Sequence, residues 1–213
     1  PEARSGQLEA FRLRSAVLGR EEEVRVYLPA RFRASRRYPL LVMHDGEDYL
    51  RFSSLRAVLD NLIHRNEVAP LVVALTQSRE RLREYAADER HGRYLAEELV
   101  PALEKRYPLA PGAANRGLAG ASFGAVASLA AAWRHPGRFG RLLLQCAQLG
   151  KRIRRLFHGI DDRTVVVGDR CVESRCCARV LRAQFTCIEN RKMDRRPRAV
   201  GPRGGAEHLI KAD

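Results

Sequence analysis

Apolar and polar residues are arranged along the first 145 residues in patterns that separate strands from helices. Apolar and polar residues alternate over residues 24–28, and Pro29 follows directly. This pattern predicts one strand of an antiparallel pair that ends before the proline. The imperfect alternation of residues 8–18 predicts its partner. Continuous apolar runs are typical of strands that are covered on both faces of a mostly parallel sheet. Three such runs lie at residues 38–43, 71–75 and 142–145.

Helical spacing occupies the segments between these runs. Residues 55–63 place apolar side chains three and four positions apart, as an amphipathic helix does. Residues 94–107 repeat that spacing, with acidic residues on the outer face. A third helix, rich in alanine, is predicted up to Trp133 and ends before Pro136. This alternation predicts an α/β fold with a mostly parallel central sheet flanked by helices. Without repeats or a low-complexity linker, residues 1–213 are interpreted as a single domain.

The composition of the chain changes near residue 146. All five cysteines lie at or after Cys146, whereas all six tyrosines and the single tryptophan, Trp133, precede it. Patterns of an α/β fold continue in this tail as a strand, a helix and a strand at 164–168, 172–181 and 184–188. Two interpretations of residues 146–213 stay open. They are either a divergent, shortened second half of the domain, or a tail read in a shifted frame or joined from elsewhere.

Charge and cysteine content limit the partners that we expect. The chain has 39 basic and 25 acidic residues, a formal net charge of +14, and only four of the basic residues are lysines. Nucleic-acid binders gather such charge on one face with aromatic residues between, and no such clustering is visible, so no nucleic-acid partner is expected. No uncharged apolar run approaches 18 residues, so no membrane-spanning helix is expected.

The five cysteines include an adjacent pair and lack the spacing of zinc ligands. An odd count makes a poor disulfide framework, which favours reduced thiols in a cytoplasmic protein without a metal site. The chain begins at Pro1 rather than methionine, and we interpret it as processed, trimmed or a fragment.

The clearest chemical motif is Gly-Ala-Ser-Phe-Gly at residues 120–124. A strand-like segment precedes it and an alanine-rich helix follows, which is the setting of a nucleophile elbow. In such a turn a strained backbone projects the hydroxyl of Ser122 from the sheet edge, and small flanking residues avoid collisions with the sheet or the helix. The alternative is an ordinary glycine-rich turn between a strand and a helix.

Acyl transfer also requires two donors for the oxyanion of its tetrahedral intermediate. The backbone N–H of Phe123, the residue after the serine, is the first candidate. The second is the N–H of Glu47, which follows the first buried strand, with Gly46 permitting close approach of a substrate. His44 and Asp45 are equally well explained as a strand-end turn, so neither is assigned a catalytic role.

These segments together resemble the esterases of the enterochelin esterase and esterase D group over about residues 7–145. The similarity is carried by the elbow and by residues 24–29, 38–46, 83–85, 97–101 and 135–140. It implies an α/β-hydrolase fold, a nucleophile at Ser122 and oxyanion donors at Phe123 and Glu47. Ala125 departs from the family, which usually has a second glycine there. The similarity ends after Gln145, where the family's usual serine-glycine-serine and its later His-Asn-Trp stretch are missing.

If the tail is a genuine second half, the chain order serine, acid, histidine is preserved. Asp169, directly after the strand-like run, is the candidate acid, and Glu173 is the alternative. His208 is the only histidine late enough to serve as base, whereas His158 precedes the acid strand and is expected on the surface.

The sequence therefore predicts a serine esterase that hydrolyses small-molecule carboxylic esters through an acyl-enzyme, without metal or organic cofactor. The alternative is a catalytically inactive relative that binds a ligand or acts as a scaffold. The sequence does not define an oligomeric state. Four arginines after the second buried strand either favour an acidic or siderophore-like ester or form a solvated loop; they are Arg79, Arg81, Arg83 and Arg90.

Overall fold

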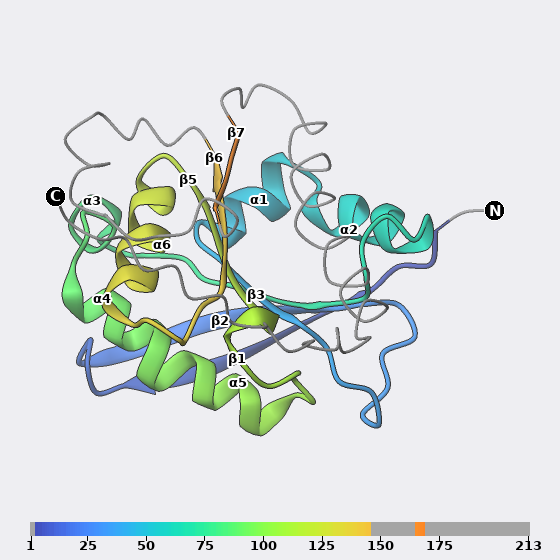
Figure 1. The fold of residues 1–213 in the computed structure, drawn as a ribbon, viewed down its shortest axis with the longest axis horizontal. Coiled ribbons are helices and arrows are strands. Elements are labelled where there is room, and N and C mark those ends of the chain that lie inside the picture. Colours follow the sequence, from blue (N-terminus) through green and yellow to red (C-terminus); the bar gives the residue numbers. More distant parts are fainter. Residues whose placement is uncertain (1–2, 146–164, 169–213) are drawn as a thin grey trace, which may run out of the picture.

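The structure, a computed structural model, describes residues 3–145 and 165–168, and its centre is a seven-stranded sheet (Figure 1). The strand order across the sheet is β1-β2-β4-β3-β5-β6-β7. The strands are β1 (Gln7–Ser15), β2 (Arg20–Leu28), β3 (Leu40–Met43), β4 (Val72–Leu75), β5 (Arg116–Ala121), β6 (Arg141–Gln145) and β7 (Val165–Gly168). This is the mostly parallel α/β sheet that the alternation of strands and helices predicted, and it agrees with the α/β-hydrolase fold that the family resemblance implied.

The two long strands at one side of the sheet form the predicted antiparallel pair. β1 and β2 are in register from Gln7 opposite Leu28 to Ser15 opposite Arg20, and Gly19 turns between them at a φ of 73°. β2 also pairs antiparallel with β4. Every remaining pairing, from β4 through β3, β5 and β6 to β7, is parallel.

Apolar side chains on the central strands are divided between the two faces of the sheet. Leu40 and Val42 belong to a core that contains residues of the helical segments from 94 to 134. Leu41 and Met43 belong to a second core with residues of α1 and α2. A strand that is buried on both faces has no need of polar alternation, which explains the continuous apolar runs in the sequence.

Helices cover both faces of this sheet (Figure 1). The α-helices are α1 (Gly46–Phe52), α2 (Leu55–His64), α3 (Arg81–Glu84), α4 (Glu89–Arg93), α5 (Val100–Arg106) and α6 (Phe123–Arg134). A π-helix, η1 (Tyr94–Leu99), and a 3₁₀ turn, η2 (Ala113–Asn115), complete them. The predicted helices at 55–63 and up to residue 133 are confirmed, and the short helices α1, α3 and α4 were not predicted.

The segment predicted as one helix over 94–107 contains two helix types. The π-helix η1 precedes α5, and Pro101 lies in the first turn of α5. Proline has no N–H to donate to the carbonyl four residues earlier, and a wider turn before it accommodates that missing bond. Apolar spacing predicts the buried face of such a segment and does not distinguish the two helix types.

Candidate active site

Ser122 occupies a sharp turn between β5 and α6, at the carboxyl ends of the parallel strands. Its φ of 52° and ψ of −117° lie outside the regions that a non-glycine residue favours. Its N–H donates to the carbonyl of Gln145 at the end of β6, with N and O 3.0 Å apart. Strain at a single residue, held by the surrounding structure, is a frequent property of functional sites.

The two glycines of the motif differ in how strictly steric contact demands them. A Cβ built on Gly120 would lie 2.4 Å from the carbonyl carbon of Gly124, which real Cβ atoms essentially never do. A Cβ on Gly124 would lie 3.2 Å from Cβ of His44, a tight contact that a small shift of the neighbour relieves. The turn therefore requires glycine at position 120 and favours it at position 124, and the strand-turn-helix context that the motif predicted is confirmed in the backbone.

The chain forms a second tight turn where β3 ends. Asp45 has a φ of 54° and precedes α1, whose first residue is Gly46. A Cβ on Gly46 would lie 2.5 Å from Cβ of Leu75, so glycine is required here as well. The N–H of Gly46 donates to the carbonyl of Thr76 at 2.9 Å. Glu47 follows in the first turn of α1, and its N–H donates to Oε1 of Gln77 at 3.3 Å.

One side-chain hydrogen bond connects α1 with the strand beside the elbow. The hydroxyl of Tyr49 donates to Oε1 of Gln145 at 2.5 Å, and both side chains are buried. Gln145 therefore links α1 to the elbow. Its side chain accepts a hydrogen bond from α1, and its backbone carbonyl accepts one from the N–H of Ser122.

Asp45 forms a two-pronged ion pair with Arg81 of α3. Nε of Arg81 lies 3.0 Å from Oδ1 and Nη2 lies 2.9 Å from Oδ2 of the carboxylate. These hydrogen bonds raise the pKa of Arg81. The guanidinium carbon is 5.6 Å from the ring centre of Tyr85 and 5.9 Å from that of Phe123, which is exposed beside Ser122. A fixed cation and an aromatic ring thus lie next to the elbow.

His44 belongs to a buried chain of hydrogen bonds. Its Nδ1 lies 3.0 Å from the carbonyl oxygen of Ala119 and 3.0 Å from Oγ of Ser128. Its Nε2 lies 3.0 Å from Nε2 of His91. Since Ala119 offers only an acceptor, Nδ1 of His44 carries the proton, and Nε2 accepts from His91.

Burial lowers the pKa of His44 to about 4 and lowers that of His91 well below its ordinary value. Both rings are therefore neutral at pH 7. Nδ1 of His91 is buried and has no hydrogen-bond partner among residues 3–145 and 165–168. Two neutral, mutually bonded rings stabilise the turn after β3, and neither offers a nitrogen to a substrate.

Two further histidines in the described part of the chain lie away from the elbow. His64 ends α2, and His135 follows α6, whose 12 residues separate it from Ser122 by about 18 Å. The remaining sequence-predicted residues, namely Asp169, Glu173, His158 and His208, lie outside the described residues. The strand predicted before Asp169 is present as β7, and Gly168 pairs with Gln145.

The four arginines after β4 have partners within the protein. Arg79 donates to the carbonyl of Glu21, Arg83 pairs with Glu80, and Arg90 donates to the carbonyl of Val17. Arg81 is bound to Asp45. All four arginines thus bind groups of the protein itself, as in a structured surface loop, and are not free cations that await an acidic substrate.

Within residues 3–145 and 165–168, no group of three or more His, Cys, Asp or Glu side chains is placed to hold a metal ion. Over the same described residues, no helix combines the length and apolar character needed to cross a bilayer.

A family model described as "Putative esterase" matches residues 15–163, which is more than half of the chain. The chain belongs to this esterase family. The resemblance that the motifs indicated is therefore confirmed at the level of the family.

Curated relatives show how far this similarity extends. The uncharacterized protein YjcH of Bacillus subtilis strain 168 is 26% identical over 166 residues, which are 75% of this chain and 69% of that protein. The iron(III) enterobactin esterase of Escherichia coli strain K12 is 31% identical over 110 residues, which are 50% of this chain and 28% of that enzyme.

Among solved structures, the enterobactin esterase from Shigella flexneri superposes with a TM-score of 0.67 at 23% identity. The match covers 89% of this chain and 53% of that enzyme, so this esterase spans about half the length of its structural relative. At this identity the likeness establishes the α/β-hydrolase fold.

Sequence reasoning located the elbow and missed the groups that support it. The partners of His44 and Asp45 are His91 and Arg81, which are 47 and 36 residues away along the chain. Neither pairing has a local sequence signal. The bond between Tyr49 and Gln145 was missed for the same reason.

Proposed function

We propose that this esterase is a serine hydrolase that cleaves small-molecule carboxylic esters, with Ser122 as nucleophile. The observation that carries the proposal is the strained backbone of Ser122, two residues after a glycine that steric contact requires. A φ of 52° at a serine is a cost that an ordinary turn would avoid with glycine. The strain therefore favours a function for the hydroxyl itself.

In the proposed reaction, His208 takes the proton of the Ser122 hydroxyl as its oxygen attacks the ester carbonyl. Collapse of the tetrahedral intermediate breaks the bond to the alcohol, which leaves with the proton returned by the imidazolium. Water then attacks the acyl-enzyme, the imidazole again accepts and returns one proton, and the acid and free serine are released. Asp169 orients the imidazole and stabilises its cation.

Elimination supports a base from the second half of the chain. His44 and His91 are buried and neutral, and His64 and His135 lie away from the elbow. Of the six histidines only His158 and His208 remain. The chain order of the fold places the base after the acid, which favours His208.

The position of β7 supports Asp169 as the acid. β7 runs parallel to β6, and its last residue, Gly168, is opposite Gln145, whose carbonyl binds the N–H of Ser122. Asp169 is the next residue along the chain. Glu173 stays the alternative acid.

We assign the oxyanion donors to the backbone N–H groups of Phe123 and Glu47. Phe123 is the first residue of α6 and Glu47 the second of α1, both at the carboxyl edge of the sheet, where helix N-termini favour negative charge. Gln77 accepts from the N–H of Glu47 over 3.3 Å, a long hydrogen bond that a substrate oxygen can replace. Each donor contributes about 3 kcal/mol of transition-state stabilisation.

The test combines a fluorophosphonate probe with turnover of p-nitrophenyl acetate. We expect wild-type protein to be labelled at Ser122 and to hydrolyse the ester. Ser122→Ala should abolish labelling and lower kcat by at least about a thousandfold. Ser35→Ala, on an exposed loop, is the matched control and should match wild type.

Variants of the tail distinguish the candidate acid and base. His208→Ala and Asp169→Asn should each lower kcat by about a thousandfold or more, whereas His158→Ala and Glu173→Gln should leave it near wild type. Wild-type protein that is folded, unlabelled and inactive would refute the proposed enzyme activity and favour the binding or scaffold alternative.

The absence of a disulfide framework in the sequence supports a cytoplasmic location, which fractionation of the native host would test.

A further inference from the structure

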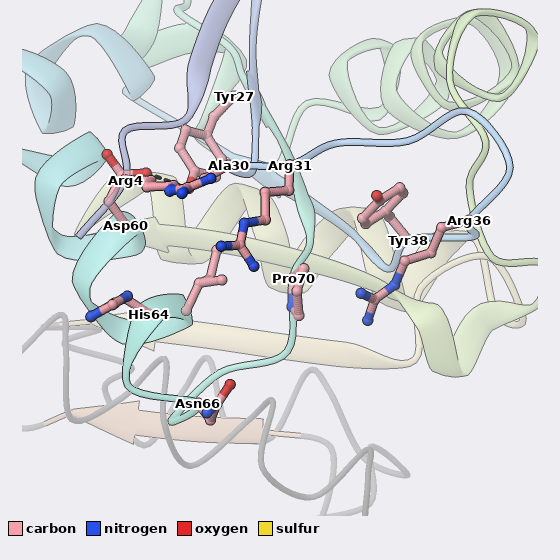
Figure 2. Close-up of a pocket in the computed structure, with 11 residues that line it drawn as sticks. Arg4, Tyr27, Ala30, Arg31, Arg36, Tyr38, Asp60, His64, Asn66 and Pro70 are labelled. Atoms are coloured by element: carbon pink, nitrogen blue, oxygen red, sulfur yellow. Dashed lines mark hydrogen bonds between the residues drawn. The ribbon is translucent and has the colours of Figure 1, made fainter. Parts of the chain in front are cut away.

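A hollow in the protein surface lies at the opposite edge of the sheet from Ser122. It has a volume of about 560 Å³ and borders the residues that lead into β3 and β4 and out of β2 (Figure 2). Tyr38 and Pro70 precede β3 and β4, and Arg31 follows β2. This is the amino edge of the parallel strands, whereas Ser122 follows the carboxyl end of β5. A volume of this size is typical of small-molecule sites.

Three arginines border this hollow without a carboxylate partner. Within the described part of the chain, Arg4, Arg31 and Arg36 form no ion pair within 4.0 Å. Figure 2 shows Arg4 and Arg31 on one side of the hollow and Arg36 with Tyr38 on the other. The guanidinium carbon of Arg36 lies 5.6 Å from the ring centre of Tyr38. Grouped cations of this kind create a positive potential in a concave site.

Asp60 is the single acidic residue among the described residues that line the hollow, and its carboxylate already has partners. Oδ1 accepts from the N–H of Gly6 at 2.7 Å and from the hydroxyl of Tyr27 at 2.8 Å. Arg56 lies 4.0 Å from Oδ2. The side chain is buried, so its charge is used to hold the N-terminal segment against α2 and leaves the three arginines uncompensated.

The wall that carries two of these arginines is ordered by local contacts. Arg31 has a φ of 60°, a left-handed conformation, in a turn closed by the N–H of Phe32 and the carbonyl of Pro29 at 3.0 Å. The rings of Phe32 and Tyr38 stack with their centres 5.0 Å apart, and the Tyr38 hydroxyl accepts from the N–H of Arg33 at 2.9 Å. The loop therefore presents its cations from a fixed framework, which lowers the entropy lost on binding.

We propose that this hollow, defined by Arg4, Arg31 and Arg36, is a binding site for a small organic anion that carries a phosphate group or several carboxylates. Guanidinium groups bind both groups through paired N–H donors, and their charge persists at any physiological pH. The site is separate from the ester-hydrolysis centre and does not depend on the function proposed for Ser122.

The test measures binding of inorganic pyrophosphate and of citrate by isothermal titration calorimetry at low salt, in buffer free of other multivalent anions. We expect saturable binding of at least one probe, weakened by added salt because charge–charge attraction is screened. Preference for pyrophosphate indicates a phosphate ligand, and preference for citrate a polycarboxylate. Arg31→Ala and Arg36→Ala should each lower affinity by about tenfold, and the double variant should show no saturable binding.

A double variant that loses the same charge elsewhere is the matched control. Arg12→Ala with Arg14→Ala removes two exposed arginines of β1 and should change affinity less than about twofold. Binding that falls equally in this control, or that persists in Arg31→Ala/Arg36→Ala, would overturn the site, as would the absence of saturable binding in wild type. Circular dichroism establishes that each variant is folded, and p-nitrophenyl acetate turnover by the pocket variants should equal that of wild type.

Discussion

The two edges of the central sheet use charge and space in opposite ways. At the carboxyl edge the backbone next to the exposed Ser122 is tightly packed at Gly120, Asp45 is bound by Arg81, and His44 is neutral inside a hydrogen-bond chain. At the amino edge a hollow of about 560 Å³ is bordered by arginines that form no ion pair with a carboxylate of the described residues. One edge is specified by backbone geometry and the other by side-chain charge.

This difference explains why one edge is recognisable from sequence and the other is not. A turn that admits only hydrogen at Gly120 and leaves little space at Gly124 produces a short motif in the chain. A hollow whose cations come from positions 4, 31 and 36 leaves no motif, because any exposed arginine satisfies the same pattern. Substitutions at the carboxyl edge should therefore lower the free energy of unfolding, whereas those at the amino edge should change it little.

The largest expected effect is that of a methyl group in the elbow. Gly120→Ala would bring Cβ within 2.4 Å of the Gly124 backbone, so we expect a loss of about 3 kcal/mol in the free energy of unfolding. Gly92→Ala in α4 is the matched control, because its new Cβ would meet atoms only at 3.5 Å or more. That variant should be neutral or more stable by up to about 1 kcal/mol. Urea titration measures both, and equal losses would contradict a steric origin.

The next effect concerns pH and the buried His44. The pKa of His44 is about 4 in the folded protein, below the ordinary value of 6.5. As the pH falls, this histidine is therefore protonated in the unfolded chain before it is protonated in the folded one. The stability contributed by the neutral ring is complete above about pH 6.5 and is lost as the pH falls toward 4. Between pH 7.5 and pH 5 we expect a loss of about 2 kcal/mol from this group, with His91 acting in the same direction.

Urea titrations at several pH values measure this loss. His91→Phe should flatten the pH dependence, because it removes one buried titrating ring. His64→Gln, at an exposed position, should leave the slope as in wild type. A wild-type protein whose stability is constant between pH 7.5 and pH 5 would show that these rings are accessible to protons.

A smaller effect is expected from the ion pair beside the elbow. Asp45→Asn keeps the shape of the side chain and tolerates the left-handed backbone, but it removes the charge that Arg81 faces. Arg81 is partly exposed, so we expect a loss of about 1 to 2 kcal/mol. Arg83→Gln, which breaks an exposed pair with Glu80, should cost less than about 0.5 kcal/mol. Thermal unfolding of the two variants ranks them, and the reverse order would contradict the proposed contrast.

The smallest effect is predicted at the amino edge. Arg31→Ala and Arg36→Ala remove no carboxylate contact and relieve repulsion between like charges. Each should change the free energy of unfolding by less than about 0.5 kcal/mol. A loss above about 1 kcal/mol in either variant, measured in urea, would show that these side chains stabilise the fold and would remove the contrast between the two edges.

The sequence predicted the parts of the fold that repeat a simple pattern. The antiparallel pair, the buried strands and the longer amphipathic helices follow from alternation or spacing. The short helices α1, α3 and α4 were missed because helices of four to seven residues are stabilised by tertiary packing rather than by their own sequence.

The candidate site divides in the same manner. The elbow was predicted from the residues, and its backbone geometry supports that prediction. Gly46 was expected to admit a substrate, whereas the contact that requires glycine there is with Leu75. The pairs His44–His91 and Asp45–Arg81 could not be predicted, because contact between residues so distant in the chain depends on the folded topology. Asp169 and His208 stay predictions, since they lie outside the described residues.

The left-handed backbone at Ser122 has an evolutionary consequence. Glycine adopts such a conformation without penalty, so Ser122→Gly relieves strain on the order of 1 kcal/mol while removing the nucleophile. Any lineage of this protein released from selection for hydrolysis gains stability by drifting to glycine there. Retention of serine across orthologues would consequently record continuing selection on catalysis, and glycine at that position would identify those descendants that have become inert.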